Sequence, residues 1–270
     1  MKLSLTALIL SAISAAVLAT PGSDAAPTPA STPSTPSGKG YNDWNCKPLE
    51  GRRPVILVHA TLFTKESWAI FGPAIAEQGY CVYSLTYGRY WKTLLPMVGA
   101  IAPAVDNAKE VGDFAEKVLG ATGGKGKIHS MIGLSAINHG TTWQGLAPLL
   151  EKLKEMVKFL TLNVDIVTKA APALQDIMST SKFIQELNAH GETLPDVFQA
   201  NIVTKYDEIV SPYKSGFQSG PGVVNVVLQD LCESAYVEHA LMVASKTTLR
   251  WILNQLDPTT ASPANCNPKF

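Results

Sequence analysis

The sequence has little charge: 16% of its residues are Asp, Glu, Lys or Arg, and the formal net charge is zero. This balance favours neither nucleic acid nor an anionic surface as a partner. Long hydrophobic runs are also missing, since no segment holds roughly eighteen uninterrupted apolar residues, so we expect no stable membrane span. The chain contains no Asn-x-Ser/Thr sequon, which excludes N-glycosylation.

The N-terminus is typical of a secretory signal peptide. Met1 and Lys2 precede an apolar run that ends in Val17-Leu18-Ala19, with small residues where a signal peptidase requires them. We predict a signal peptide over residues 1–19, cut after Ala19, and a secreted, extracellular product; an uncleaved anchor is the alternative. Residues 20–40 contain five prolines among Ser, Thr, Ala and Gly, and this composition predicts a disordered leader.

The sequence contains only four cysteines, Cys46, Cys81, Cys232 and Cys266. In an exported chain this number favours two disulfides, for which three pairings are possible. We prefer Cys46–Cys81 and Cys232–Cys266, because each of these bonds closes a local loop near one end of the domain.

Residues 41–270 predict one α/β domain, because buried strands alternate with helical segments. A β-branched run at residues 54–59 is typical of a strand that is buried on both faces of a parallel sheet. Asp106 is expected to cap a helix that the glycines at 120–126 end. The remaining expected strands lie at 80–87, 128–134, 200–204 and 223–228, and the remaining helices at 68–78 and 238–256.

Residues 143–194 are expected to be helical, with an apolar stripe that includes Leu149, Leu153 and Leu160. Two interpretations of this stripe stay open. It packs into the core, or it forms a mobile lid over an apolar pocket.

Two side chains suited to acid–base chemistry follow separate strands. Asp207 comes three residues after the strand at 201–204, and His239 follows the strand that begins at Val223. Active sites of such sheets lie at the carboxyl ends of the strands, where a carboxylate can orient an imidazole that serves as a base. Each residue has an ordinary structural explanation, a turn former for Asp207 and a solvated loop side chain for His239.

At these positions the sequence resembles the secreted class 2 lipase family of the α/β-hydrolases. The resemblance covers residue 42 to the C-terminus and is carried by the stretches 53–61, 79–88, 132–142, 203–213 and 226–232 together with His239. It implies a lipase or esterase that hydrolyses apolar carboxylic esters in lipid catabolism. It further implies Asp207 as the acid, His239 as the base and the backbone N–H of Thr61 as an oxyanion donor. No cofactor and no metal is implied, and we expect a monomer.

The pentapeptide Gly-x-Ser-x-Gly, which places the nucleophilic serine of this family on a tight turn, is absent. A strand, this turn and a helix need about 25 residues from typical element lengths. Only Gly123-Gly-Lys-Gly126 joins the helix expected at 106–122 to the strand at 128. We therefore predict an α/β-hydrolase-like three-layer sandwich with a mostly parallel sheet, from which one central strand–turn–helix unit is missing.

Three functional hypotheses follow. The protein is a lipase or esterase by family whose activity is impaired, or it is a non-catalytic fold that binds a lipid or a protein. The third hypothesis is a hydrolase that uses Ser135 within Gly133-Leu-Ser135-Ala-Ile137, where Ile137 replaces the second glycine. Ile137 is β-branched at a position where the tight turn requires no side chain, which weighs against Ser135 as nucleophile.

Overall fold

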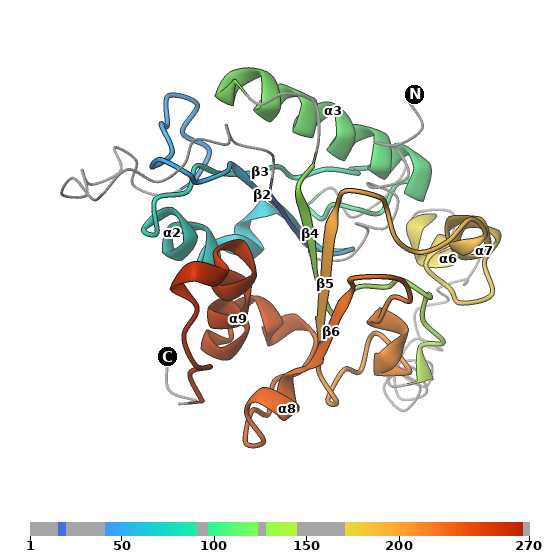
Figure 1. The fold of residues 1–270 in the computed structure, drawn as a ribbon. Coiled ribbons are helices and arrows are strands. Elements are labelled where there is room, and N and C mark those ends of the chain that lie inside the picture. Colours follow the sequence, from blue (N-terminus) through green and yellow to red (C-terminus); the bar gives the residue numbers. More distant parts are fainter. Residues whose placement is uncertain (1–15, 20–40, 91–96, 124–127, 145–170, 267–270) are drawn as a thin grey trace.

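The structure is a computed structural model that describes residues 16–19, 41–90, 97–123, 128–144 and 171–266. Its core is a six-stranded sheet in the order β3-β2-β1-β4-β5-β6 (Figure 1). The strands span Ala16–Ala19 (β1), Val55–Val58 (β2), Val82–Ser84 (β3), Ser130–Leu134 (β4), Phe198–Val203 (β5) and Val224–Val227 (β6).

Strand β1 differs from the other described strands in its direction. The pairs β2–β3, β4–β5 and β5–β6 are parallel. β1 lies between β2 and β4 and pairs antiparallel with both, with Ala16 opposite Val58 and Gly133 and with Ala19 opposite Val55 and Ser130. The sheet is therefore parallel except at its centre, where the last residues of the predicted signal peptide form the strand.

Helices cover both faces of the sheet and produce three layers (Figure 1). Helix α3 (Ala104–Thr122) covers one face, and α2 (Phe71–Ala76) and α9 (Lys246–Leu256) cover the other. The shorter helices are α6 (Ala173–Asp176), α7 (Lys182–Asn188) and α8 (Leu228–Leu231). The 3-10 helices are η2 (Lys65–Trp68), η4 (Tyr213–Gly216), η5 (Ala240–Ala244) and η6 (Pro258–Thr260).

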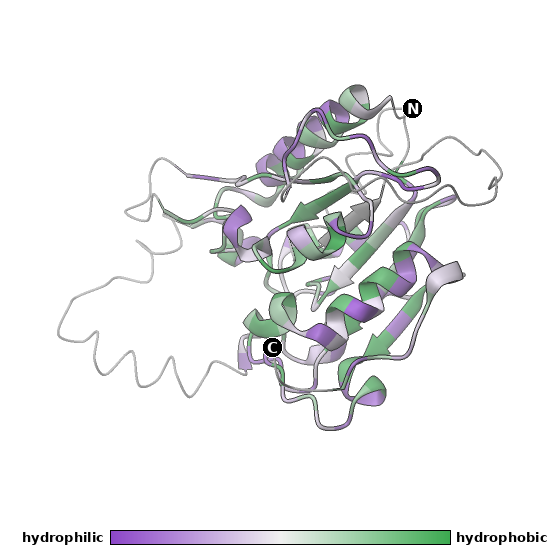
Figure 2. Ribbon diagram, turned by 90° about the vertical axis from the view of Figure 1, so that its left-hand side faces the viewer, coloured by the Kyte–Doolittle hydropathy of each residue, from purple (hydrophilic) through white to green (hydrophobic). Residues whose placement is uncertain are grey.

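The alternation of side chains along β2 explains how the two faces become buried. Val55 and Leu57 pack with Trp68, Phe71 and α9 on one side, whereas Ile56 and Val58 pack with α3 on the other. All four β2 side chains are fully buried, as a strand between two helical layers requires. Figure 2 shows that hydrophobic residues concentrate on the strands of the sheet.

Helix α3 begins earlier than its sequence pattern predicts. The residue before its first turn is Pro103, and the expected cap, Asp106, lies inside that turn. Asp106 is favourable at either place, because a carboxylate stabilises the positive end of the helix dipole. The helix continues through Gly120 and ends at Gly123, whose φ of 72° is left-handed, as glycine readily permits.

The C-terminal helix is also shorter than the predicted span of 238–256. His239 precedes the 3-10 helix η5, and Ser245 then caps α9 by accepting a hydrogen bond from the Thr248 N–H. The predicted strand at 223–228 lies at the edge of the sheet and is only half-buried, with Leu228 already in α8.

Two disulfides connect Cys46 to Cys81 and Cys232 to Cys266, which is the pairing that we preferred from the sequence. The first fastens the loop before β2 to the start of β3. The second fastens the end of α8 to the C-terminal tail.

The region predicted as helical at 143–194 is only partly described. Its described part contains α6, α7 and the loops around them. The apolar stripe with Leu149, Leu153 and Leu160 lies outside the described residues, so both interpretations of it stay predictions. Among the described residues, no helix is long and apolar enough to cross a membrane.

Candidate active site

The structure brings Asp207 and His239 into contact at the carboxyl edge of β5 and β6. The His239 Nδ1 atom lies 2.9 Å from Asp207 Oδ2 and 3.0 Å from Oδ1. The Asp207 side chain is 1% exposed and that of His239 is 10% exposed. An ionised Asp207 therefore accepts the Nδ1 proton, which leaves the Nε2 atom of His239 as the basic nitrogen.

A tight turn after β5 fixes the Asp207 carboxylate. Its Oδ1 atom accepts hydrogen bonds from the backbone N–H groups of Ile209, at 3.0 Å, and Val210, at 2.6 Å. These bonds hold one oxygen in the turn, so the carboxylate keeps one orientation toward His239.

The loop that carries His239 is attached to the end of β5 by two buried polar side chains. The Thr204 hydroxyl donates to the carbonyl of Val237 at 2.6 Å. The Gln229 amide donates to the carbonyl of Ala235 at 2.8 Å and to the Thr204 hydroxyl at 3.0 Å. Thr204 and Gln229 thus tie the loop that carries His239 to the end of β5, which leads into the turn that carries Asp207. These bonds help to hold Asp207 and His239 in contact.

Two further carboxyl groups lie beside this pair, and sequence reasoning missed them. Glu208 accepts a hydrogen bond from the His239 backbone N–H at 3.3 Å. A hydrogen bond with Glu208, partial burial and the charge of Glu208 raise the pKa of Glu238. The adjacent pairs Asp207-Glu208 and Glu238-His239 in the sequence were the available signal.

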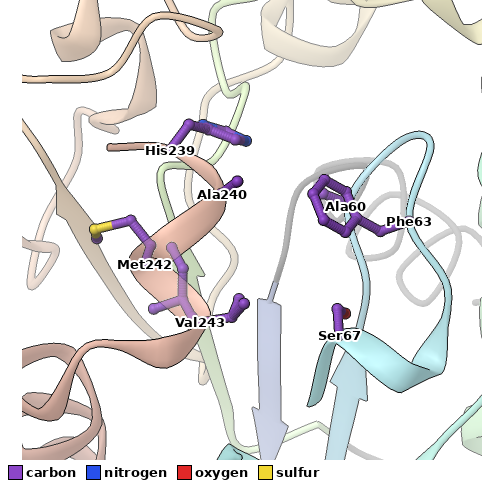
Figure 3. A pocket seen from close by; sticks show the side chains of 8 residues that line it. Ala60, Phe63, Ser67, His239, Ala240, Met242 and Val243 are labelled. Atoms are coloured by element: carbon purple, nitrogen blue, oxygen red, sulfur yellow. The ribbon is translucent and has the colours of Figure 1, made fainter. Parts of the chain in front are cut away.

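His239 also lines an apolar pocket of about 320 Å³, part of it open to solvent. Figure 3 shows the His239 ring extending from the start of η5 toward the opposite wall. That wall comes from the segment that follows β2, and Leu134 at the end of β4 completes the lining. The lining residues are Ala60, Phe63, Ser67, Leu134, His239, Ala240, Met242 and Val243.

The residue expected as an oxyanion donor, Thr61, follows pocket-lining Ala60. Among the described residues no group accepts a hydrogen bond from the Thr61 backbone N–H. The Thr61 hydroxyl is buried and has no hydrogen-bond partner in this part of the chain. Ala60 is absent from the residues with positive φ, whereas Leu62 has a φ of 69°. A side chain at position 60 is thus accommodated without a left-handed backbone.

His59, at the end of β2, is fixed as a neutral structural residue. Its Nε2 atom accepts from the Tyr87 backbone N–H at 3.2 Å, its Nδ1 atom lies 2.9 Å from the Ala60 carbonyl, and its ring stacks on that of Tyr87. Burial lowers the pKa of His59 to about 4, against smaller opposing contributions from the Ala60 carbonyl and Glu66. Both ring nitrogens are therefore engaged away from the pocket chemistry.

Ser135 occupies the turn at the end of β4 in a conformation that L-residues rarely adopt. Its φ is 45°, it is 1% exposed, and its hydroxyl has no hydrogen-bond partner among the described residues. A Cβ on Gly133 would lie 2.9 Å from the Ala136 Cβ, so the chain reverses tightly around Ser135. Ile137 is nonetheless accommodated, because it packs with Ala104, Ile177 and Val210.

The described residues place an imidazole at the pocket, with no hydroxyl bonded to it. Within them, the imidazole of His239 forms hydrogen bonds to Asp207 alone, and no serine hydroxyl is bonded to it. They also contain no group of three or more His, Cys, Asp or Glu side chains that could hold a metal ion. The arrangement can hold and transfer a proton beside an apolar ligand.

This chain is similar to solved structures that include the crystal structure of Aspergillus fumigatus lipase B. The similarity has a TM-score of 0.50 and 17% sequence identity, and it covers 82% of this chain but 55% of that chain. The chain therefore spans little more than half the length of the lipase. No model of a known protein family and no curated protein matches the sequence. Together with the mostly parallel sheet between helical layers, this similarity assigns an α/β-hydrolase-like fold, as the sequence predicted.

Proposed function

We propose that this protein is an exported lipase- or esterase-type member of the α/β-hydrolases that binds apolar carboxylic esters and whose ester hydrolysis is severely impaired. The contact between Asp207 and His239 at the rim of the apolar pocket carries this proposal. In serine hydrolases such a pair activates a hydroxyl, and the pair has no such function when no hydroxyl is within reach.

The chemistry of the pocket supports an apolar substrate. Its walls include Phe63, Leu134, Met242 and Val243, and a lining of this kind selects hydrocarbon over polar ligands. Thr61 would supply one N–H to an ester oxygen, because this group is free among the described residues. Asp207 and His239 would hold and move the proton.

Two disulfides support export, since such bonds form and persist in oxidising compartments. A place in extracellular lipid catabolism is consistent with the fold, and the secreted class 2 lipase family remains the assignment that the motifs favour.

Turnover of p-nitrophenyl esters of several chain lengths, together with labelling by a fluorophosphonate probe, tests the proposal. We expect no labelled serine and a rate equal to that of the His239→Ala variant. A non-hydrolysable ether analogue should still bind, and His239→Ala should weaken its binding more than His190→Ala, which changes an exposed histidine. Turnover that needs His239 but not His190 would contradict the proposed impairment.

A hydrolase that uses Ser135 is the second candidate. The observations in its favour are the left-handed backbone and the buried, unpartnered hydroxyl of Ser135, because strained residues concentrate at functional sites. Fluorophosphonate labelling at Ser135, lost in Ser135→Ala, would replace the first proposal with this one.

A further inference from the structure

The centre of the sheet contains a position that some strand must fill. β2 and β4 have fully buried side chains and lie on either side of β1. Two strands separated by a third lie about 9–10 Å apart, twice the usual spacing, and cannot form hydrogen bonds with each other. Without β1, the backbone groups of β2 and β4 that face this position would be unpaired inside the protein, and each such group is costly.

The direction of β1 agrees with the way the chain continues. Ala19 ends β1 opposite Val55 and Ser130, at the amino-terminal edge of the parallel strands. The next described residues lie at that same edge, where the Asn42 backbone N–H donates to the Val82 carbonyl at 2.8 Å. The connection, residues 20–40, can span up to roughly 70 Å when extended. The described residues before and after it, Ala19 and Asn42, lie at one edge of the sheet, which agrees with an antiparallel β1.

We propose that Ala16–Ala19 remains in the exported protein as its central strand, and that the signal peptide is cut after Ser14 rather than after Ala19. Ala12 and Ser14 place small residues at the −3 and −1 positions of this alternative site. The apolar run before it, Leu3 to Ser11, is within the usual length of a signal-peptide core. The mature chain then begins at Ala15 and carries the complete strand.

This strand cannot take over the role of the missing unit. β1 ends with Ala19 at the edge opposite Asp207 and His239, because β1 is antiparallel to its neighbours. A turn placed after β1 would therefore present no side chain to the pocket. This inference is independent of the proposed function, since the strand is needed for folding whether or not esters are cleaved.

The N-terminus of the exported, soluble protein tests the proposal, and intact mass measures it. We expect the chain to begin at Ala15, five residues before Thr20. Ser14→Gln, which places a large residue at the proposed −1 position, should change this start, whereas Ala19→Gln should leave it unchanged. A soluble, folded protein that begins at Thr20 overturns the proposal.

Hydrogen exchange of the same exported protein provides a second test. In Leu18→Pro, amides of Val55–Val58 and Ser130–Leu134 should exchange about 100-fold faster, because proline interrupts strand pairing. Ala25→Pro is the control, because its segment already holds five prolines. In this variant the exchange rates of the same amides should not change. If Leu18→Pro does not fold, Leu18→Gly should give the same pattern in weaker form. Unchanged exchange in both Leu18 variants overturns the proposal.

Discussion

The carboxyl edge of the sheet differs between the side formed by β5 and β6 and the centre occupied by β1. On one side, β5 and β6 are parallel strands whose loops bring Asp207 and His239 to 2.9 Å, with Thr204 and Gln229 anchoring the loops. At the centre, β1 runs antiparallel to its neighbours. Its last residue, Ala19, therefore lies at the amino-terminal edge of the sheet, away from Asp207 and His239.

The difference shows that the contact between Asp207 and His239 does not depend on the strand at the centre of the sheet. Within the described part of the chain, the hydrogen bonds that position Asp207 and His239 come from β5, β6 and the segments that follow them. The centre of the sheet can therefore be rebuilt while the pair keeps its geometry. We therefore expect Asp207 and His239 to activate a serine hydroxyl once one is placed within reach of His239 Nε2.

Providing that serine is the change with the largest expected effect. Replacing Gly123–Gly126 with a strand, a Gly-x-Ser-x-Gly turn and a helix, about 25 residues in all, should raise kcat/KM for p-nitrophenyl esters by about 10³-fold or more. The restored strand should take the place of β1. The same insertion with Ala for the elbow Ser should give no increase. A folded serine variant without activity would show that Asp207 and His239 are not poised for catalysis.

Removing the acid should harm folding strongly, because the Asp207 carboxylate accepts three hydrogen bonds in a buried turn. Asp207→Ala is expected to lower the free energy of unfolding by about 3–4 kcal/mol, from hydrogen bonds to a charged group and the donors left unpaired. Asp207→Asn retains an acceptor and should cost about 1 kcal/mol. Urea denaturation measures both values. Equal values for the two variants would exclude the anchoring role.

The buried His59 should make the stability of the protein depend on pH. His59 has a pKa of about 4 in the folded protein and about 6.5 when unfolded. The unfolded chain binds more protons between these values, so stability is complete above pH 6.5 and falls by about 3 kcal/mol as the pH approaches 4.

The difference between wild type and His59→Gln isolates this effect, since glutamine can still accept from the Tyr87 N–H. We expect the wild type to lose about 3 kcal/mol more than the variant between pH 7 and pH 4 in urea titrations. Parallel pH profiles of the two proteins would mean that His59 is protonated in the folded state.

The smallest expected effect compares two buried serines. The Ser135 hydroxyl has no described partner, whereas the Ser84 hydroxyl donates to the Leu57 carbonyl at 2.8 Å. Ser135→Ala should therefore stabilise the protein by about 1 kcal/mol, and Ser84→Ala should destabilise it by a similar amount. Thermal unfolding of the two variants checks the signs. A loss of stability in Ser135→Ala would show that its hydroxyl is engaged.

The sequence predicts those features whose causes are local. The β-branched run at 54–59 marks a doubly buried strand, and Asp207 and His239 come together because each follows its own parallel strand. Element boundaries are less certain, since Asp106 suits a cap and a first turn equally well, and Ser245 rather than Glu238 begins α9.

β1 could not be predicted, because its cause is not local. A four-residue segment, Ala16–Ala19, belongs by composition to a leader, and only the unpaired edges of β2 and β4, distant in sequence, make it a strand. The carboxyl groups of Glu208 and Glu238 were missed for another reason, because their position beside Asp207 and His239 in the sequence was not used. Pairing across long sequence separations is a tertiary effect that residue patterns do not contain.

A cysteine pair tests most directly whether β1 lies between β2 and β4 and runs antiparallel to both. Leu18 is the antiparallel partner of Met131, whereas Ile132 is the partner of Val17, and only residues directly opposite each other on neighbouring strands are close enough for a disulfide. Among the described residues the native cysteines are all paired. The full chain with Leu18→Cys and Met131→Cys should form a disulfide, and Leu18→Cys with Ile132→Cys should not. Equal cross-linking of both pairs, or none in a folded protein, would contradict a strand at this place.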